Sequence, residues 1–205
     1  MANVSNVKSK FFGAVDALDA DGISVAATIG SATTLTLGGT LTSGGSYTSG
    51  DNIGQLVTIL SAADDSGITF TIVGTDAVGD AQTEVVTGAD TTTATSSGYF
   101  NTVASITTSA ATAGNVSAGV TATGTGTVFA GRTRIRGLQG LSGASAGNLL
   151  FKNTSVTGTT LLTVPTQAAA ELIEPYIPDN AVLFDAGAYV NFGSAVATVT
   201  VFYDG

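Results

Sequence analysis

Short runs of alternating apolar and polar residues fill the chain almost from end to end, and Gly, Ser, Thr and Asp separate these runs. A period of two is typical of β-strands, because successive side chains point to opposite faces of a sheet. The separating residues are those that tight turns require. The sequence therefore predicts an all-β fold, built of two small antiparallel modules of the β-sandwich or jelly-roll-like type and an extended N-terminal arm.

The clearest local element is a β-hairpin in the first half of the chain. Residues 67–73 alternate with their large apolar side chains on one face, and residues 82–87 form a second alternating run. The Asp-, Gly- and Ala-rich residues 76–80 between them suit a turn. Further strands are expected in this half at 33–37, 55–60, 101–108 and 115–120.

The positions of the expected strands and turns divide the chain into three segments. We expect an arm at residues 1–22, a β-sandwich module at 23–124 and a jelly-roll-like module at 125–205. The small, polar, Gly-punctuated residues 121–126 are the expected linker between the modules. Strands of the second module are expected at 128–136, 148–152, 159–164, 171–177, 181–184, 188–192 and 195–203.

Charge is scarce and uneven. The chain has 6 Lys and Arg against 15 Asp and Glu, a net charge of −9, and residues 23–124 hold no Lys or Arg. Binding to a phosphate backbone depends on basic side chains, so we expect no nucleic-acid partner. No stretch reaches the roughly 18 apolar residues of a membrane span, so we expect no membrane partner and read no secretory signal.

The residues that most enzymes use are missing. There is no His and no Cys, so a serine nucleophile would lack its usual base, and thiolate metal sites and disulfides are excluded. Paired carboxylates can hydrolyse glycosides, and the only glutamates are Glu84, Glu171 and Glu174. Trp is absent, so no sugar-stacking platform is visible. We expect no enzyme activity and no cofactor.

One acidic segment has a loose likeness to a calcium loop. Asp16, Asp19 and Asp21 lie close together ahead of Gly22. Calcium needs several carboxylates on one short loop, but this spacing is not that of an EF-hand and no later Glu completes it. A polar turn is the preferred interpretation, and no metal site is expected.

The most specific local feature is a row of three arginines. If residues 132–136 form a strand, Arg132, Arg134 and Arg136 share one face, and Thr133 and Ile135 share the other. A charged edge strand that blocks unwanted pairing is one interpretation. The other, which we favour, is an interface row that meets carboxylates of a neighbouring subunit.

A second candidate interface lies in the predicted arm. Lys8, Lys10, Phe11 and Phe12 form a short cluster of basic and aromatic residues. A solvated terminus is one interpretation. The alternative is an arm that docks on a partner, because two adjacent Phe side chains are poorly accommodated in water.

Four stretches of the first module, Ile59–Asp76, Thr83–Gly88, Tyr99–Thr107 and Ala111–Val116, carry a family resemblance. Through them, residues 44–120 resemble a module that recurs in virion structural proteins of tailed bacteriophages. The run from Gly147–Lys152 to Val199–Tyr203 is also similar to small virion proteins of the cyanophage type. The resemblance implies a structural role in the virion without a catalytic residue, and it does not distinguish head from tail.

These observations lead to one hypothesis and its alternatives. The hypothesis is a capsid decoration (cement) protein, a homotrimer on the outer surface of the virion head that bridges subunits of the major capsid protein. The alternatives are a tail-associated fibre or adaptor protein and a host-glycan-binding module. An enzyme is the most distant class.

Overall fold

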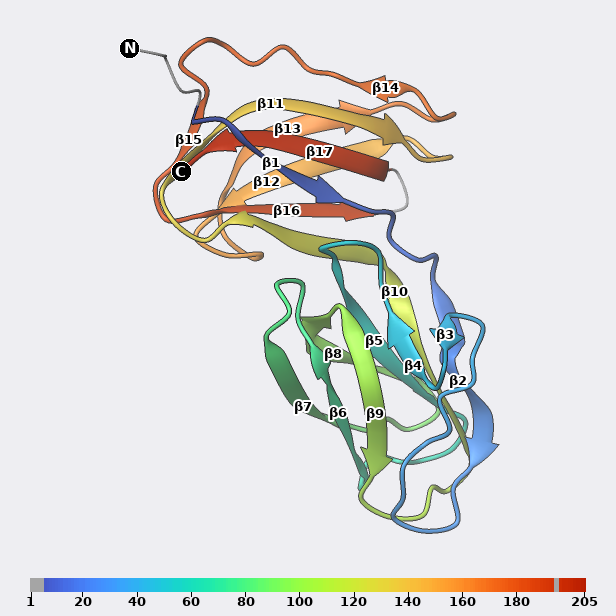
Figure 1. The fold of residues 1–205 in the computed structure, drawn as a ribbon. Helices are drawn as coiled ribbons and strands as arrows, with labels where there is room; N and C mark the ends of the chain where they lie inside the picture. The colour runs from blue at the N-terminus through green and yellow to red at the C-terminus, as the bar shows by residue number, and fades with distance from the viewer. Residues whose placement is uncertain (1–5, 194–195) are drawn as a thin grey trace. The chain divides into compact units, whose positions relative to one another are not determined.

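The computed structural model describes residues 6–193 and 196–205. Within these ranges every regular element is a β-strand, which confirms the predicted all-β class (Figure 1). In the described part of the chain, no helix is present that could cross a membrane.

The chain divides into two compact units. Unit 1 combines Met1–Val15 with Thr125–Gly205, and unit 2 is Asp16–Gly124. Unit 2 is thus inserted into the sequence of unit 1, and two chain segments connect the two. The division after Gly124 falls where the sequence predicts the end of the first module.

Unit 2 is a sandwich of two sheets. One sheet has the strand order β3 (Thr42–Ser43), β4 (Ser46–Thr48), β9 (Thr102–Thr108), β6 (Thr69–Thr75) and β7 (Ala81–Thr87). The other contains β8 (Thr93–Phe100), β5 (Gly54–Ser61), the first part of β10 (Asn115–Phe129) and β2 (Asp19–Thr28). Apolar side chains from both sheets form one buried cluster, which includes Phe70, Ile72, Val57 and Ile59.

The predicted hairpin is confirmed. Strands β6 and β7 pair antiparallel from Thr69 opposite Thr87 to Thr75 opposite Ala81. Phe70 and Ile72 are fully buried. The alternation that predicted the hairpin is therefore the alternation that fills the core of unit 2.

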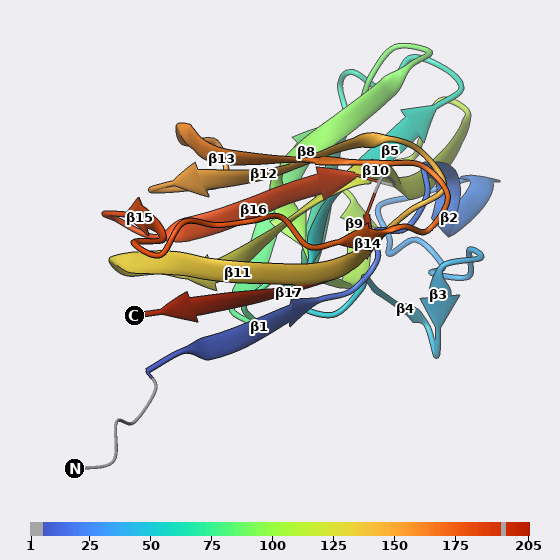
Figure 2. The same cartoon turned by 90° about the horizontal axis from the view of Figure 1, so that it is seen from above.

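Unit 1 also has two layers. The first contains β1 (Lys8–Phe12), β17 (Val196–Asp204), β11 (Thr133–Ser142) and β14 (Leu172–Ile173), with β15 (Val182–Phe184) also pairing with β11. The second contains β13 (Thr160–Thr166), β12 (Gly147–Asn153), β16 (Ala188–Gly193) and the end of β10. Figure 2 shows β1, β17 and β11 side by side.

The predicted N-terminal arm has a different place in the structure. Residues 8–12 form β1, an edge strand that pairs antiparallel with β17. Phe12 is fully buried, and its ring lies 6.1 Å from that of Phe192 in the opposite layer. Residues 19–28 form β2 of unit 2. The described residues of the segment therefore belong to the two sandwiches, because burial of Phe12 and backbone pairing outweigh a solvated conformation.

Several strand and linker boundaries in the structure also differ from those predicted from the sequence. The expected linker 121–126 lies inside β10, where its threonines suit an extended strand. The expected strand 128–136 is interrupted by a bend at residues 130–132, which includes the flexible Gly131. Only an isolated bridge at Thr34 represents the strand expected at 33–37. The strand expected at 171–177 shrinks to β14, because the prolines that follow cannot donate to a ladder.

Candidate functional site

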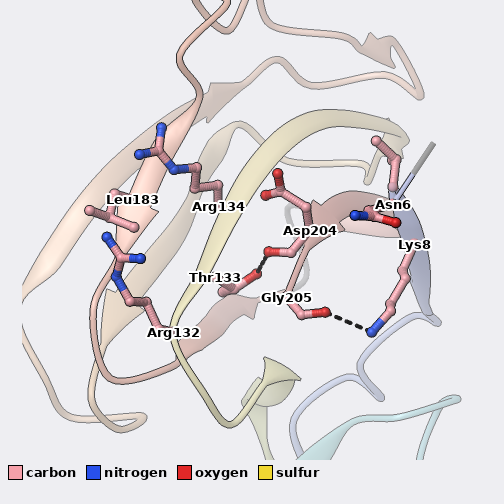
Figure 3. A pocket seen from close by; sticks show the side chains of 9 residues that line it. Asn6, Lys8, Arg132, Thr133, Arg134, Leu183, Asp204 and Gly205 are labelled. Carbon is pink, nitrogen blue, oxygen red and sulfur yellow. Dashed lines mark hydrogen bonds between the residues drawn. The ribbon is translucent and has the colours of Figure 1, made fainter. Parts of the chain in front are cut away.

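A hollow of about 650 Å³ opens at one end of the first layer of unit 1 (Figure 3). It is lined by residues that are far apart in the sequence, among them Asn6, Lys8, Arg132, Arg134 and Asp204. We call it the cationic hollow. It brings together one residue of the predicted basic-aromatic cluster and two of the predicted arginine row.

The strand register explains this convergence. Strand β11 lies between β15 and β17, and Arg134 pairs with Leu183 on one side and with Asp204 on the other. Strand β1 lies on the far side of β17, with Lys8 opposite Tyr203. The hollow is therefore built on four adjacent strands, and Arg132 reaches it from the bend that precedes β11.

The arginines follow the predicted alternation only in part. Thr133 and Ile135 are buried, whereas Arg134 and Arg136 project from the other face of β11. Arg132 lies before the strand begins, so only Arg134 and Arg136 of the predicted row belong to β11 itself. The hollow is lined by Arg132 and Arg134 but not by Arg136.

Arg136 is committed to partners in the same chain. Its Nε and Nη2 donate to Asp204 Oδ2 at 2.9 Å and 2.5 Å, and its Nη1 donates to the carbonyl of Asp179 at 3.1 Å. A guanidinium with several partners in a fixed fork gives strong charge-assisted hydrogen bonds. Arg136 therefore joins β11, β17 and the loop before β15.

The two arginines of the hollow retain more donor capacity. Arg134 Nη1 donates to the carbonyl of Asn180 at 2.6 Å. Arg132 Nε lies 3.7 Å from Asp185 Oδ1, and their side chains are 67% and 73% exposed. Such an exposed pair contributes little energy. Arg132 is therefore well placed to exchange this carboxylate for another.

Lys8 faces the hollow from β1. Its Nζ donates to the Gly205 carbonyl oxygen at 2.7 Å and lies 5.6 Å from the ring centroid of Phe129, a cation–π distance. The other residues of the predicted basic-aromatic cluster do not line the hollow. Lys10 is half-buried opposite Val201, Phe11 is 42% exposed, and Phe12 belongs to the core.

The hollow is positively charged on balance. Among the residues that the structure describes, its lining contains the cationic side chains of Lys8, Arg132 and Arg134 and one carboxylate side chain, that of Asp204, which Arg136 already pairs. Guanidinium groups match the geometry of carboxylates and phosphates. The hollow therefore suits an anionic group.

The acidic segment at residues 16–22 makes hydrogen bonds inside unit 2. Tyr47 donates its hydroxyl to Asp16 Oδ2 at 2.9 Å, and Thr40 donates to Asp19 Oδ2 at 2.8 Å. The bond from Thr40 lowers the pKa of Asp19 below its ordinary 3.8. Among the residues that the structure describes, no three His, Cys, Asp or Glu side chains are placed to hold a metal ion.

The three glutamates are divided between the two units. Glu84 accepts from the backbone and hydroxyl of Ser97 at 2.7 Å each and from the Gly98 amide at 2.9 Å, which ties β7 to β8. Glu171 and Glu174 lie in unit 1 and line a separate hollow of about 240 Å³. Glu84 therefore links the two sheets of unit 2 by hydrogen bonds.

Sequence reasoning missed Gln55, the centre of a buried network in unit 2. Its Oε1 accepts from Ser49, Tyr47 and the Asp16 amide, and its Nε2 donates to the carbonyls of Asp16 and Thr121. Gln55 is fully buried. The only signal in the sequence is a polar residue between the apolar Ile53 and Val57.

Comparison with known proteins adds no relative. No protein-family model, no curated protein and no solved structure matches the chain.

Proposed function

We propose that the protein is a structural component of a tailed-bacteriophage virion and, within that class, a capsid decoration protein. In this proposal it binds the outer surface of the head and bridges subunits of the major capsid protein. Binding only to the assembled shell would stabilise that shell by mass action. The protein would act without catalysis and without a cofactor.

The place of the resembling stretches in the fold supports this proposal. Ile59–Asp76, Thr83–Gly88 and Tyr99–Thr107 fall on the strands from β5 to β9, which form much of the sandwich of unit 2. The C-terminal stretches fall on β12 and β17 of unit 1. The likeness to virion proteins thus concerns the residues that build both sandwiches.

The observation that carries a binding role is an exposed segment, residues 172–180, whose far end is held by arginines. Leu172 is 61% exposed and Tyr176 is 86% exposed. Further along the same segment, Arg136 and Arg134 hydrogen-bond the carbonyls of Asp179 and Asn180. Exposed aromatic and apolar side chains on a fixed segment are typical of protein interfaces, since little entropy is lost on binding.

Immunogold electron microscopy of virions with antibody to this chain tests the proposal. Dense label over the head is the expected result, because a decoration protein is present in hundreds of copies. Label confined to the tail would replace decoration by the fibre or adaptor function. Absence of label, together with absence of the chain from purified dissociated virions by mass spectrometry, would overturn a virion role.

A set of variants tests the contact surface. Tyr176→Ser and Leu172→Ser should reduce occupancy of capsids by about tenfold, because buried apolar contacts would be lost. Val85→Ser, which changes a 59% exposed apolar residue of unit 2, is the matched control. Unchanged occupancy in the unit 1 variants would place the capsid contact elsewhere.

A further inference from the structure

All the basic residues of the chain belong to one unit. Unit 2 contains ten Asp or Glu and no Lys or Arg, a net charge of −10, whereas unit 1 holds all six Lys and Arg and five Asp or Glu, a net charge of +1. Two copies would therefore repel each other through their unit 2 surfaces and attract each other when unit 1 of one copy meets unit 2 of the other.

We propose that the cationic hollow of unit 1 binds the β6–β7 turn, residues 76–80, of unit 2 in a second copy. The copies then associate head to tail. This inference deepens the proposed function by naming the surfaces through which the protein assembles with itself.

The turn is fixed before any contact is made. The Asp76 amide donates to the Asp80 carbonyl at 2.9 Å, and the Gly79 amide donates to the Asp76 carbonyl at 3.1 Å. Asp76 Oδ1 also accepts from the amides of Val78 and Asp80 at 2.9 Å and 3.0 Å. A segment already ordered in one conformation loses little entropy when it binds.

The turn also presents the two kinds of group that the hollow can accept. Val78 is 52% exposed and Asp80 is exposed two residues later. The hollow offers the apolar Val7 and Leu183 beside Arg132. Val78 would contact the apolar part, and the Asp80 carboxylate would replace the weak 3.7 Å pairing of Arg132 with Asp185.

Such an interface joins two different surfaces of the same chain. Head-to-tail contacts close into a ring when the rotation between copies divides the circle, and otherwise they extend into a filament. The trimer expected from the sequence would be the closed form with three copies. In a ring every hollow is completed by residues from the neighbouring copy, and in a filament every hollow except the one at the end is.

The test measures the mass of the purified full-length protein by sedimentation equilibrium over a range of concentrations. At an ionic strength of about 0.05 M the wild type should associate, and at about 1 M it should dissociate, because salt then screens charges beyond roughly 3 Å. Arg132→Glu and Asp80→Lys should each weaken association by about tenfold or more. Lys152→Glu and Asp90→Lys, the same charge changes elsewhere on the two units, should leave it within about threefold.

Mixing the variants gives the decisive result. Arg132→Glu and Asp80→Lys proteins, each impaired alone, should form at least heterodimers when combined, because the unchanged hollow of the Asp80→Lys protein then meets the unchanged turn of the Arg132→Glu protein. A wild type that is monomeric at every concentration would overturn the inference, as would an Arg132→Glu effect no larger than that of Lys152→Glu. A mixture that fails to associate would overturn it too. None of these results depends on where antibody labels the virion, so the two proposals can fail separately.

Discussion

At the scale of single residues, Gln55 secures both ends of unit 2. Asp16 is the first residue of that unit, and Thr121 precedes its end at Gly124 by three positions. Gln55 hydrogen-bonds the backbone of both. Burial raises the pKa of the Tyr47 hydroxyl well above its ordinary 10.0, so this hydroxyl remains a donor at neutral pH. One amide side chain therefore fixes the two segments through which the chain enters and leaves unit 2.

Replacing this amide should be costly. Gln55→Leu is expected to lower the free energy of unfolding by about 3 kcal/mol or more, because several buried donors and acceptors each lose a partner worth about 1–3 kcal/mol. Urea unfolding followed by circular dichroism measures the change. Gln139→Leu, at an exposed position of β11, should shift the same free energy by less than about 0.5 kcal/mol. Equal effects at the two sites would contradict the role of the network.

Asp64 provides a prediction about pH. Hydrogen bonds from the hydroxyl and amide of Ser66, at 2.6 Å and 3.0 Å, lower the pKa of this carboxyl below its ordinary 3.8. The folded chain thus binds this proton less tightly than the unfolded chain does. The stabilisation is complete above the unfolded pKa and is lost as pH falls through the folded pKa.

The Asp64→Asn variant isolates this contribution. The difference in unfolding free energy between wild type and variant should be constant from pH 7 to about 5 and should shrink below about pH 4. Urea titrations at a series of pH values measure it. Asp51→Asn, at an exposed turn position, is the control. A free-energy difference between wild type and variant that grows as the pH falls would contradict the lowered pKa of Asp64.

At the scale of elements, local pattern predicted the β6–β7 hairpin but not the strand pairs between segments far apart in the sequence. Strands β6 and β7 carry their alternation and their turn within nineteen residues, Thr69–Thr87, so the sequence alone located them. Strand β1 pairs with β17 at the other end of the chain. Lys8–Phe12 has no clean alternation, and nothing nearby indicates a partner, so this segment resembled an arm.

The same limit applies to the candidate site: the sequence identified individual residues but not their arrangement in space. The sequence singled out Lys8, Arg132 and Arg134 because basic residues are rare in this chain. It could not show that they share one hollow, since that depends on the order β15, β11, β17, β1 across the sheet. The sequence did not indicate Asp204 as a site residue, because isolated acidic residues are common in this chain.

Strand β1 also offers two adjacent positions with opposite environments. Phe12→Ala should lower the free energy of unfolding of unit 1 by about 3–5 kcal/mol, because a fully buried ring would be replaced by a cavity next to Phe192. Phe11→Ala, at a side chain 42% exposed, should cost markedly less. Thermal unfolding of the two variants compares them. Equal losses would argue against the packing of β1 in the core.

At the scale of the whole molecule, the two units differ in how they can fold. The core cluster of unit 2 lies entirely within residues 23–120. Unit 1 needs chain from both sides of the insertion, because β1 pairs with β17 and buries Phe12. Unit 2 is therefore a continuous folding unit, and unit 1 is a discontinuous one.

Fragments should reveal this difference. Residues 16–124 alone are expected to unfold cooperatively on heating, because their core is complete. Residues 125–205 alone are expected to lack a cooperative transition, and a peptide of residues 1–15 should restore one. Circular dichroism melting measures all three samples. A cooperative transition in 125–205 without the peptide would show that β1 is dispensable for the fold of unit 1.

Because β1 pairs with β17, β1 can take its place in the sheet only after the ribosome has synthesised β17. The hydrogen bond from Lys8 to Gly205 spans 197 positions. At about 5–20 residues per second, β1 waits roughly 10–40 s for its partner to be translated. Unit 2 emerges whole during that interval and can fold first. Strand β1 thus leaves the ribosome long before β17 and is placed only when β17 follows, and until then the apolar Phe12 side chain remains exposed to water.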